Sequence, residues 1–355
     1  MIVIADDITG AAEIAGIAFS HGQQVRLACS GLACSCNAAT NGTMVIATDT
    51  RSMNESEAIA ETLRVASHLS PHTSHLFKKT DSALRGHVVA ELTALLQATD
   101  YQRVVYLPAN PSKGRIIRAG TYYINKIPIH QTDFSFDPEF PARTSVLRER
   151  FPDAEAHGII MPDAESEEDI RHVITKYNDG KTIFAGAADL FSALLKQNHG
   201  DRLCDLTTNH EVSPHDTLIL CGSTQSKALS LGIPVAPMPR EIYDGSDNLS
   251  LWNTEAYKQK NNLILTIPHT HRTGKEVAVH LRNMMANMAK QLIAIHRPNQ
   301  LIIEGGATAW ATLQALGWTS FEIKNQIAPG VVQMSATNGT LVTLKPGSYP
   351  WGNLF

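Results

Sequence analysis

Short apolar runs alternate with longer amphipathic stretches along most of the chain. Residues 1–5, 44–49 and 103–109 are apolar runs with the composition of buried strands, and residues 55–69 and 88–99 have the apolar spacing of helices. This alternation predicts α/β domains in which helices flank mainly parallel, doubly wound sheets. The same pattern predicts further strands at 24–30, 75–81, 158–164 and 182–188.

The alternation is interrupted twice. Residues 115–150 are rich in Gly, Pro and aromatic side chains, which predicts a loop or flap. Residues 204–216 are polar, and a second series of strands and helices follows them. We therefore expect two domains, 1–212 and 213–355. The second series consists of strands at 217–223, 262–269, 300–306 and 340–347, and helices at 225–232, 274–295 and 307–317.

Composition narrows the class of protein. The 355 residues carry a net charge of −4, which offers no general attraction for nucleic acid or anionic membranes. Asp6 breaks the first apolar run too early for a signal peptide, and no later window is apolar enough to span a membrane. We expect a cytoplasmic protein that binds neither nucleic acid nor membrane, with a homodimer left open. The five cysteines, Cys29, Cys34 and Cys36 among them, lack the paired spacing of a zinc site.

Charged residues recur where the predicted strands of the first domain end. Ligands of open α/β sheets bind at these carboxyl ends, because loops and helix N-termini converge there. Each residue alone has a structural explanation, such as a helix cap or a surface ion pair. Together, three cations with carboxylates suit an anionic substrate that also carries hydroxyl groups. The residues expected to share one cleft are Asp7, Arg51, Lys79, Asp81 and Arg85.

Glycine turns mark the strand ends of the second domain, at residues 220–226, 301–310 and 344–352. Such turns let backbone N–H groups and a helix N-terminus approach a phosphate, although glycine can also simply end a strand. Three such turns favour a nucleotide-phosphate site. Neither the G-x-x-x-x-G-K-[ST] loop nor the G-x-G-x-x-G fingerprint occurs where those folds require it.

These motifs together resemble the four-carbon acid sugar kinases. The resemblance rests on "ADDITGAAE", "TDTRS", "KKTDSALRGH" and "PANPSKGR" in the first domain, and on "GSTQS", "GGATA", "APG" and "LKPGSYPWG" in the second. It implies an N-terminal sugar-acid domain, a C-terminal ATP domain, and phosphorylation of threonate, erythronate or 3-oxo-tetronate at the terminal hydroxyl in the cleft between them. Phosphoryl transfer would also use Mg²⁺ to screen the phosphates.

The resemblance also implies roles for particular residues. Asp7 is assigned to the attacking hydroxyl, Asp81 is the second catalytic candidate, and Asp6 is interpreted as a helix cap or a supporting partner of the substrate site. The metal ligands stay unassigned. The implied substrate contacts are Asp6, Arg51, Lys79, Arg85 and Asn110, and the implied ATP contacts are Ser223, Gly305, Gly306, Ala307, Thr308 and Gly347.

Two other functions remain open at this point. Ala307 stands where the family usually has an acidic residue, so a sugar-acid binding or sensing protein without catalysis is one alternative. Lys79 in a cation-rich cleft could instead form a Schiff base in an aldolase or isomerase. The sequence does not decide which four-carbon acid is used or its stereochemistry.

Overall fold

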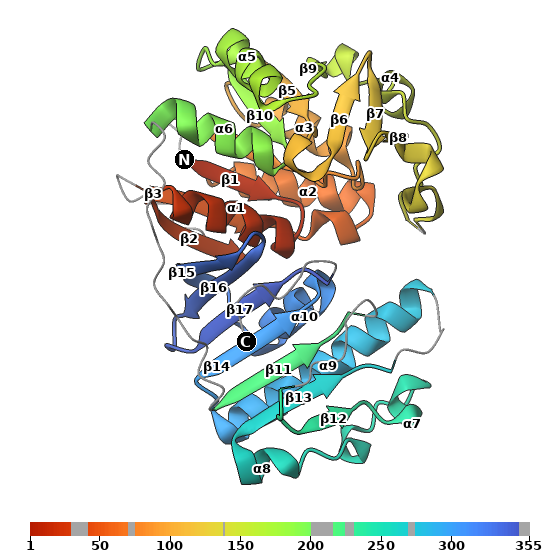
Figure 1. The fold of residues 1–355 in the computed structure, drawn as a ribbon, viewed down its shortest axis with the longest axis vertical. Coiled ribbons are helices and arrows are strands. Elements are labelled where there is room, and N and C mark those ends of the chain that lie inside the picture. Colours follow the sequence, from red (N-terminus) through yellow and green to blue (C-terminus); the bar gives the residue numbers. More distant parts are fainter. Residues whose placement is uncertain are drawn as a thin grey trace. The chain divides into compact units, whose positions relative to one another are not determined.

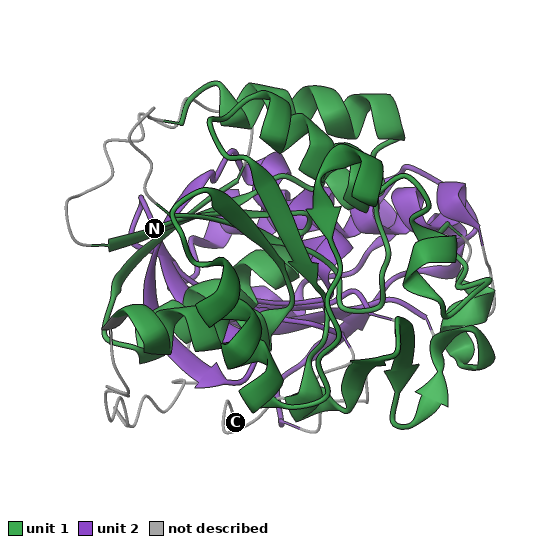
Figure 2. Cartoon of the chain, turned by 90° about the horizontal axis from the view of Figure 1, so that it is seen from above, with its two compact units in different colours: residues 1–204 green, residues 205–355 purple. Residues whose placement is uncertain are grey.

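The computed structural model divides the chain into two compact units, residues 1–204 and 205–355 (Figure 2). The boundary predicted after residue 212 falls outside the described residues, as do Cys34, Cys36 and most of the helix predicted at 225–232. The cleft predicted between the domains stays a prediction. The structure describes residues 1–29, 42–69, 75–137, 139–199, 216–223, 231–268 and 274–347.

Unit 1 is built on a parallel sheet with the strand order β2-β3-β1-β4-β10-β5-β9. The predicted α/β architecture is confirmed (Figure 1). The central strands are continuously apolar because helices cover a parallel sheet on both faces. The strands are β1 (Ile2–Ala5), β2 (Gln24–Cys29), β3 (Gly42–Ala47), β4 (Leu76–Lys79), β5 (Arg103–Leu107), β9 (Ile159–Ile160) and β10 (Thr182–Gly186).

The helices of unit 1 lie on both faces of this sheet. Lys78 of β4 contacts Glu91 of α3, whereas Lys79, the next residue, faces Glu13 of α1. Successive side chains of a strand point to opposite faces, so α1 and α3 lie on opposite sides of the sheet. Helix α1 packs against α6, and α2 packs against α3. The helices are α1 (Ile8–Ser20), α2 (Glu55–Ala66), α3 (Val88–Gln97), α5 (Glu167–Tyr177) and α6 (Ala188–His199).

The segment predicted as a loop or flap contains a small antiparallel sheet of its own. Asn125 and Lys126 both adopt positive φ between β7 and β8, which is the geometry of a tight hairpin turn. This segment and its flanks contain β6 (Arg115–Arg118), β7 (Thr121–Ile124), β8 (Ile127–Pro128), α4 (Leu147–Arg150) and the 3-10 helices η2 (Pro111–Lys113), η3 (Ile129–Gln131), η4 (Asp133–Phe136) and η5 (Glu155–His157). A further 3-10 helix, η1 (Thr50–Ser52), follows β3.

Unit 2 contains a mixed sheet with the strand order β12-β13-β11-β14-β17-β16-β15. Neighbours from β12 to β17 are parallel, and the hairpin of β15 and β16 adds two antiparallel strands. The four predicted strands are confirmed, and the hairpin was not predicted. The strands are β11 (Thr217–Cys221), β12 (Val235–Pro237), β13 (Asn262–Thr266), β14 (Gln300–Glu304), β15 (Ser320–Ala328), β16 (Val331–Ala336) and β17 (Leu341–Lys345).

Two longer helices dominate unit 2, and they pack against each other. None of the helices in the described part of the chain has the length and apolar character needed to cross a bilayer. The helical elements are α7 (Arg240–Tyr243), η6 (Leu249–Leu251), α8 (Ala256–Lys260), α9 (Lys275–His296) and α10 (Gly306–Leu316).

Candidate functional site

An ion-pair network occupies the carboxyl ends of β1, β3 and β4, which are neighbours in the sheet of unit 1. Arg51, in η1 after β3, contacts the Asp7 carboxylate, and its Nη1 lies 2.9 Å from Asp81 Oδ1. Arg85 Nε and Nη2 each donate to the Asp81 carboxylate over 2.9 Å. The structure thus brings Asp7, Arg51, Asp81 and Arg85 together, as the sequence predicted for these four side chains.

Lys79 lies beside α1, next to two residues that the sequence analysis missed. Its Nζ is 3.7 Å from Glu13 Oε2 and donates to the Thr80 carbonyl over 2.9 Å. Glu13 Oε1 also accepts from Lys113 Nζ over 2.6 Å. A Cβ on Gly10 would stand 3.2 Å from Lys79 Nζ, so glycine gives the ammonium room against the helix. Glu13 is the single charged residue of α1, and this is the sequence signal that could have identified it as a partner of the two lysines.

Asp7 caps α1. Its Oδ1 accepts from the Gly10 N–H over 2.9 Å, and its Oδ2 accepts from the Thr9 hydroxyl. The interpretation of Asp6 as the cap is therefore wrong, because the helix begins at Ile8 and the residue before it is the one with extended backbone. Burial opposes ionisation of Asp7, but Arg51 and these hydrogen bonds outweigh it and hold the pKa of Asp7 below its ordinary value.

Asp6 has the opposite environment. Its side chain is 2% exposed, and its Oδ1 has no hydrogen-bond partner among the described residues. Burial raises the pKa of Asp6 to about 6, even though Arg51, Lys78 and Lys79 favour the charged form. The two adjacent aspartates therefore differ in their pKa: that of Asp7 is lowered, so Asp7 stays ionised, whereas that of Asp6 is raised to about 6.

A pH-dependent stability difference follows from Asp6. Its folded pKa of about 6 exceeds the ordinary aspartate pKa of 3.8, so the charged form disfavours folding above pH 6 and this penalty vanishes below pH 4. We compare the free energy of unfolding of Asp6→Asn with that of wild type. This difference should shift in favour of Asp6→Asn by about 1 to 3 kcal/mol when the pH is raised from 4 to 8. Urea unfolding of both proteins at the two pH values measures it. A stability difference that does not change with pH would contradict the assignment.

Asp81 anchors the two guanidinium groups. Its Oδ2 also accepts from the Ala83 N–H over 2.9 Å, so both carboxylate oxygens are engaged. Burial opposes ionisation, yet Arg51 and Arg85 hold the pKa of Asp81 well below its usual range. Asp81 is therefore a fixed anion that orients Arg51 and Arg85.

Asn110 is placed by the fold in a structural role. Its side chain is buried, and its Oδ1 accepts from the Asp189 N–H over 3.0 Å. Its backbone pairs with Arg115, which donates to the Ser82 hydroxyl and lies 5.8 Å from the centroid of the Phe134 ring. The amide oxygen of Asn110 is thus used in holding the loop before β6.

In unit 2, three glycine turns follow neighbouring parallel strands in register. Cys221 of β11 pairs with Glu304 of β14, and Glu304 pairs with Lys345 of β17. The Gly222 N–H donates to the Glu304 carbonyl over 3.2 Å, and the Gly305 N–H donates to the Lys345 carbonyl over 2.9 Å. The turns after the three strands therefore begin at the same level of the sheet.

These turns are packed too tightly for side chains at two positions. A Cβ on Gly347 would overlap Ser223 Oγ, and a Cβ on Gly222 would overlap Thr308 Oγ1. Gly305 has φ +99°, which L side chains rarely adopt. The structure thus brings the predicted residues Ser223, Gly305, Thr308 and Gly347 together. We call the set Gly222, Ser223, Gly305, Gly306, Ala307, Thr308 and Gly347 the glycine cradle.

The glycine cradle has features of a phosphate-binding turn. Helix α10 begins at Gly306, and its N-cap residue, Gly305, has no side chain with which to cap the first turn. Ala307 is exposed at this end and adds no charge. Thr224 and residues 348–352 of the predicted turns lie outside the described residues.

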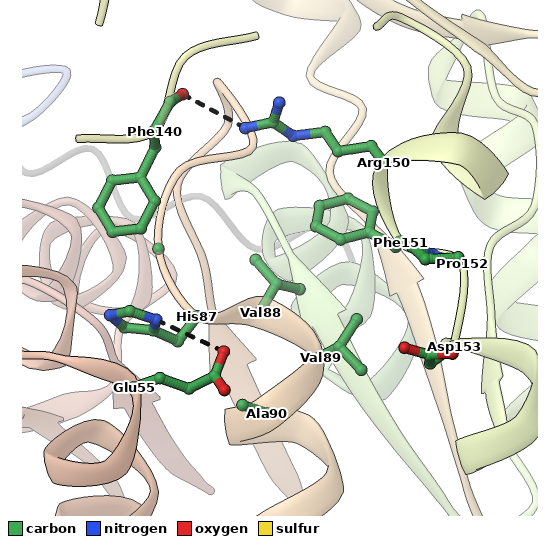
Figure 3. Close-up of a pocket in the computed structure, with 11 residues that line it drawn as sticks. Glu55, His87, Val88, Val89, Ala90, Phe140, Arg150, Phe151, Pro152 and Asp153 are labelled. Carbon is green, nitrogen blue, oxygen red and sulfur yellow. Dashed lines mark hydrogen bonds and ion pairs between the residues drawn. The ribbon is translucent and has the colours of Figure 1, made fainter. Parts of the chain in front are cut away.

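A pocket of about 310 Å³ lies at the N-terminus of α3, and its lining residue Gly86 borders the network, since a Cβ there would stand 3.6 Å from Asp6 Oδ2 and 3.7 Å from Arg51 Cγ. Figure 3 shows His87 and Phe140 on one side of it and Arg150 and Phe151 on the other. Arg150 is engaged by backbone carbonyls, including those of Leu84 and Phe140. None of the predicted site residues lines this pocket, so it is not assigned to the predicted chemistry.

No metal centre is preformed in the described ranges, where no group of three or more His, Cys, Asp or Glu side chains could hold an ion. His269 and His271 lie outside those ranges. Mg²⁺ that arrives with nucleotide phosphates needs only one or two protein carboxylates, so this finding is compatible with a nucleotide-borne ion.

Two family models match the chain in order. A sugar-binding N-terminal domain matches residues 1–153, and a nucleotide-binding C-terminal domain matches residues 243–349. The D-threonate kinase of Salmonella typhimurium is 29% identical over 55% of this chain and 53% of that protein. The 3-oxo-tetronate kinase of Brucella melitensis is 25% identical over 98% of this chain and 92% of that protein.

Solved structures agree on the fold. A Haemophilus influenzae protein from a family of unknown function superposes with a TM-score of 0.73 at 21% identity, covering 100% of this chain and 98% of that one. The fold and the two matches thus define a two-domain protein that combines a match to a sugar-binding domain family with a match to a nucleotide-binding domain family. The chain belongs to the four-carbon acid sugar kinase family.

Proposed function

We propose that this protein is an ATP-dependent kinase that phosphorylates the terminal hydroxyl of a four-carbon acid sugar: threonate, erythronate or 3-oxo-tetronate. The observation that carries the proposal is the glycine cradle, in the part of the chain that follows the sugar-binding match. Relatives named D-threonate kinase and 3-oxo-tetronate kinase support the class of substrate.

The charged network of unit 1 suits a sugar acid. Arg51, Lys79 and Arg85 supply more positive charge than a neutral polyol needs, and their present partners are carboxylates. A substrate carboxylate is the same kind of partner and can join these cations through charge-assisted hydrogen bonds. We assign substrate binding to these three side chains.

Asp7 is proposed to orient the attacking hydroxyl. Phosphoryl transfer depends mainly on positioning and charge neutralisation, so a carboxylate that stays ionised and fixed is well suited to this task. The helix cap and Arg51 fix the Asp7 carboxylate in one position. Bound ATP would supply the phosphoryl group, with Mg²⁺ neutralising its charge, and the glycine cradle would hold the phosphates through backbone N–H groups.

The aldolase alternative is disfavoured by the surroundings of Lys79. A Schiff-base lysine is activated by an apolar pocket or by a neighbouring cation. Lys79 instead faces the Glu13 carboxylate and donates to the Thr80 carbonyl, and its side chain is 6% exposed. Borohydride trapping with a carbonyl substrate would test this alternative directly.

An ADP-release screen tests the proposed function. The panel contains threonates, erythronates and their 3-oxo forms, with the matching neutral tetritols as controls. We expect turnover of at least one acid, and a preference over its tetritol of about 10-fold or more, because one charged hydrogen bond contributes roughly 1.5 to 3 kcal/mol. Sugar-acid binding without ADP release would support the sensing alternative.

A substitution in the glycine cradle tests the nucleotide site. Gly306→Val places a branched side chain at the first position of α10, where the phosphates are proposed to approach. We expect ATP affinity to fall by about 10-fold or more, while sugar-acid affinity is unchanged, as measured by calorimetry. Ala315→Val, near the other end of the same helix, is the control. Equal ATP affinity in Gly306→Val and wild type would refute the assignment.

A further inference from the structure

A buried ion pair lies directly beneath the glycine cradle. Glu304 ends β14 and Lys345 ends β17, at paired positions of adjacent parallel strands. The residues are 1% and 2% exposed, and Lys345 Nζ donates to Glu304 Oε1. The predicted nucleotide contacts did not include either residue.

The same two residues contact all three turns of the cradle. The Glu304 carbonyl accepts from the Gly222 N–H, and the Lys345 carbonyl accepts from the Gly305 N–H. The Lys345 ammonium donates to the carbonyls of Pro346 over 3.1 Å and Gly347 over 3.4 Å. The turns at Gly222 and Gly305 are thus held by main-chain carbonyls of the two residues, and the turn at Gly347 is held by the ion-paired ammonium itself.

Lys345 is not placed to bind phosphate itself. Its ammonium donates to the Glu304 carboxylate and to two backbone carbonyls, and its side chain is 2% exposed. A contribution to stability alone would not require charges here, because apolar residues of similar volume often replace a buried ion pair without loss.

We propose that the Glu304–Lys345 pair is a positioning device that holds the Gly347 turn in place beside the other two glycine turns for nucleotide phosphates, without touching the nucleotide. The inference rests on the proposed function of the cradle. Removing the pair should loosen the Gly347 turn most, because the Lys345 ammonium reaches its carbonyl directly. Small displacements of groups that position a ligand can reduce activity about 100-fold.

The test compares Lys345→Met with the double variant Glu304→Leu/Lys345→Met. Calorimetry of the full chain with ATP and Mg²⁺, in the absence of sugar acid, gives the Kd, and thermal unfolding gives the Tm. We expect the double variant to keep a Tm near that of wild type, because no unpaired charge stays buried. Its Kd for ATP should still rise about 10- to 100-fold, since the Gly347 turn is no longer held by the ammonium.

The chain offers a matched control in unit 1. Lys78 and Glu91 form a comparably buried pair, with Nζ 2.6 Å from Oε2, on strands and helices that do not carry the cradle. The double variant Lys78→Met/Glu91→Leu should leave the ATP Kd unchanged. Glu304→Gln keeps an acceptor for Lys345 and should bind ATP more tightly than Lys345→Met, which a purely structural role would not require.

The outcomes separate the inference from the proposed function. Absence of ATP binding by the wild-type protein would defeat both. Wild-type binding together with an unchanged Kd in folded Lys345→Met and in the double variant would overturn the positioning role alone. If Lys345→Met does not fold, the double variant and Glu304→Gln give the answer.

Discussion

Asp7→Asn is expected to lower kcat by about 10²- to 10⁴-fold, the range for loss of a positioned catalytic carboxylate. A loss confined to the transition state lowers kcat and kcat/KM equally. The variant should fold, because Asn caps helices as well as Asp and Arg51 keeps Asp81 as a partner. Steady-state kinetics with the acid identified by the ADP-release screen, together with calorimetry for both ligands, measures the effect.

The matched control for this variant is Asp6→Asn, one residue earlier on the same strand end. A kcat close to wild type in Asp7→Asn would remove the proposed role. Asp81 would be a poor replacement, because both of its oxygens are already engaged. The role would then pass to Asp6, whose Oδ1 lacks a hydrogen-bond partner among the residues that the structure describes.

Arg51→Met is expected to have the largest effect on stability. It removes the cation shared by Asp7 and Asp81, and loss of one partner from a buried pair typically costs about 3 to 5 kcal/mol. Since the pKa of both aspartates is depressed in the folded protein, their contribution to stability is present at pH 7 and is lost as the pH falls below the ordinary aspartate pKa of 3.8. The stability loss should therefore shrink at acidic pH.

Urea unfolding of Arg51→Met at pH 7 and at pH 2 measures this effect. The control is Arg64→Met, which removes an arginine that pairs with Glu61 on the surface of α2 and is 41% exposed. That change should cost less than about 1 kcal/mol, because water screens exposed pairs. Equal losses in the two variants would show that the network at the strand ends is not the stabilising unit inferred above.

The sequence predicted those parts of the site that depend on local pattern. Asp7, Arg51 and Asp81 follow three predicted strands, and the convergence of strand ends in a parallel sheet was enough to group them. Glu13 and Lys113 were missed because their contact joins residues 100 positions apart. The single charge in α1 marks Glu13, but no sequence pattern identifies Lys113 as its partner.

The roles of the two adjacent aspartates could not be divided from the sequence. Which of them caps α1 depends on the residue at which the helix begins, and sequence patterns locate helix ends only to within a few residues. The structure places this start at Ile8, which makes Asp7 the cap. The burial that leaves Asp6 without a partner is equally a property of the folded surroundings.

The hairpin of β15 and β16 was missed for a different reason. Residues 329 and 330 are Pro-Gly, a turn signal, but "APG" was interpreted as a family motif and not as the link between two strands. The polar positions of β15 also alternate with buried ones, so no continuous apolar run marks the strand.

Because β11, β14 and β17 share a common register, a change in the length of one of these strands disturbs the three turns more than a substitution within it does. Each residue advances a strand by about 3.3 Å, so a one-residue deletion within β14 would retract its turn by that distance relative to the other two. It would also turn the side chains beyond it to the other face of the sheet. The lengths of these strands are therefore under a tighter constraint than the identities of many of their apolar residues, and length variation among homologous chains should concentrate in the loops at the opposite ends of the strands.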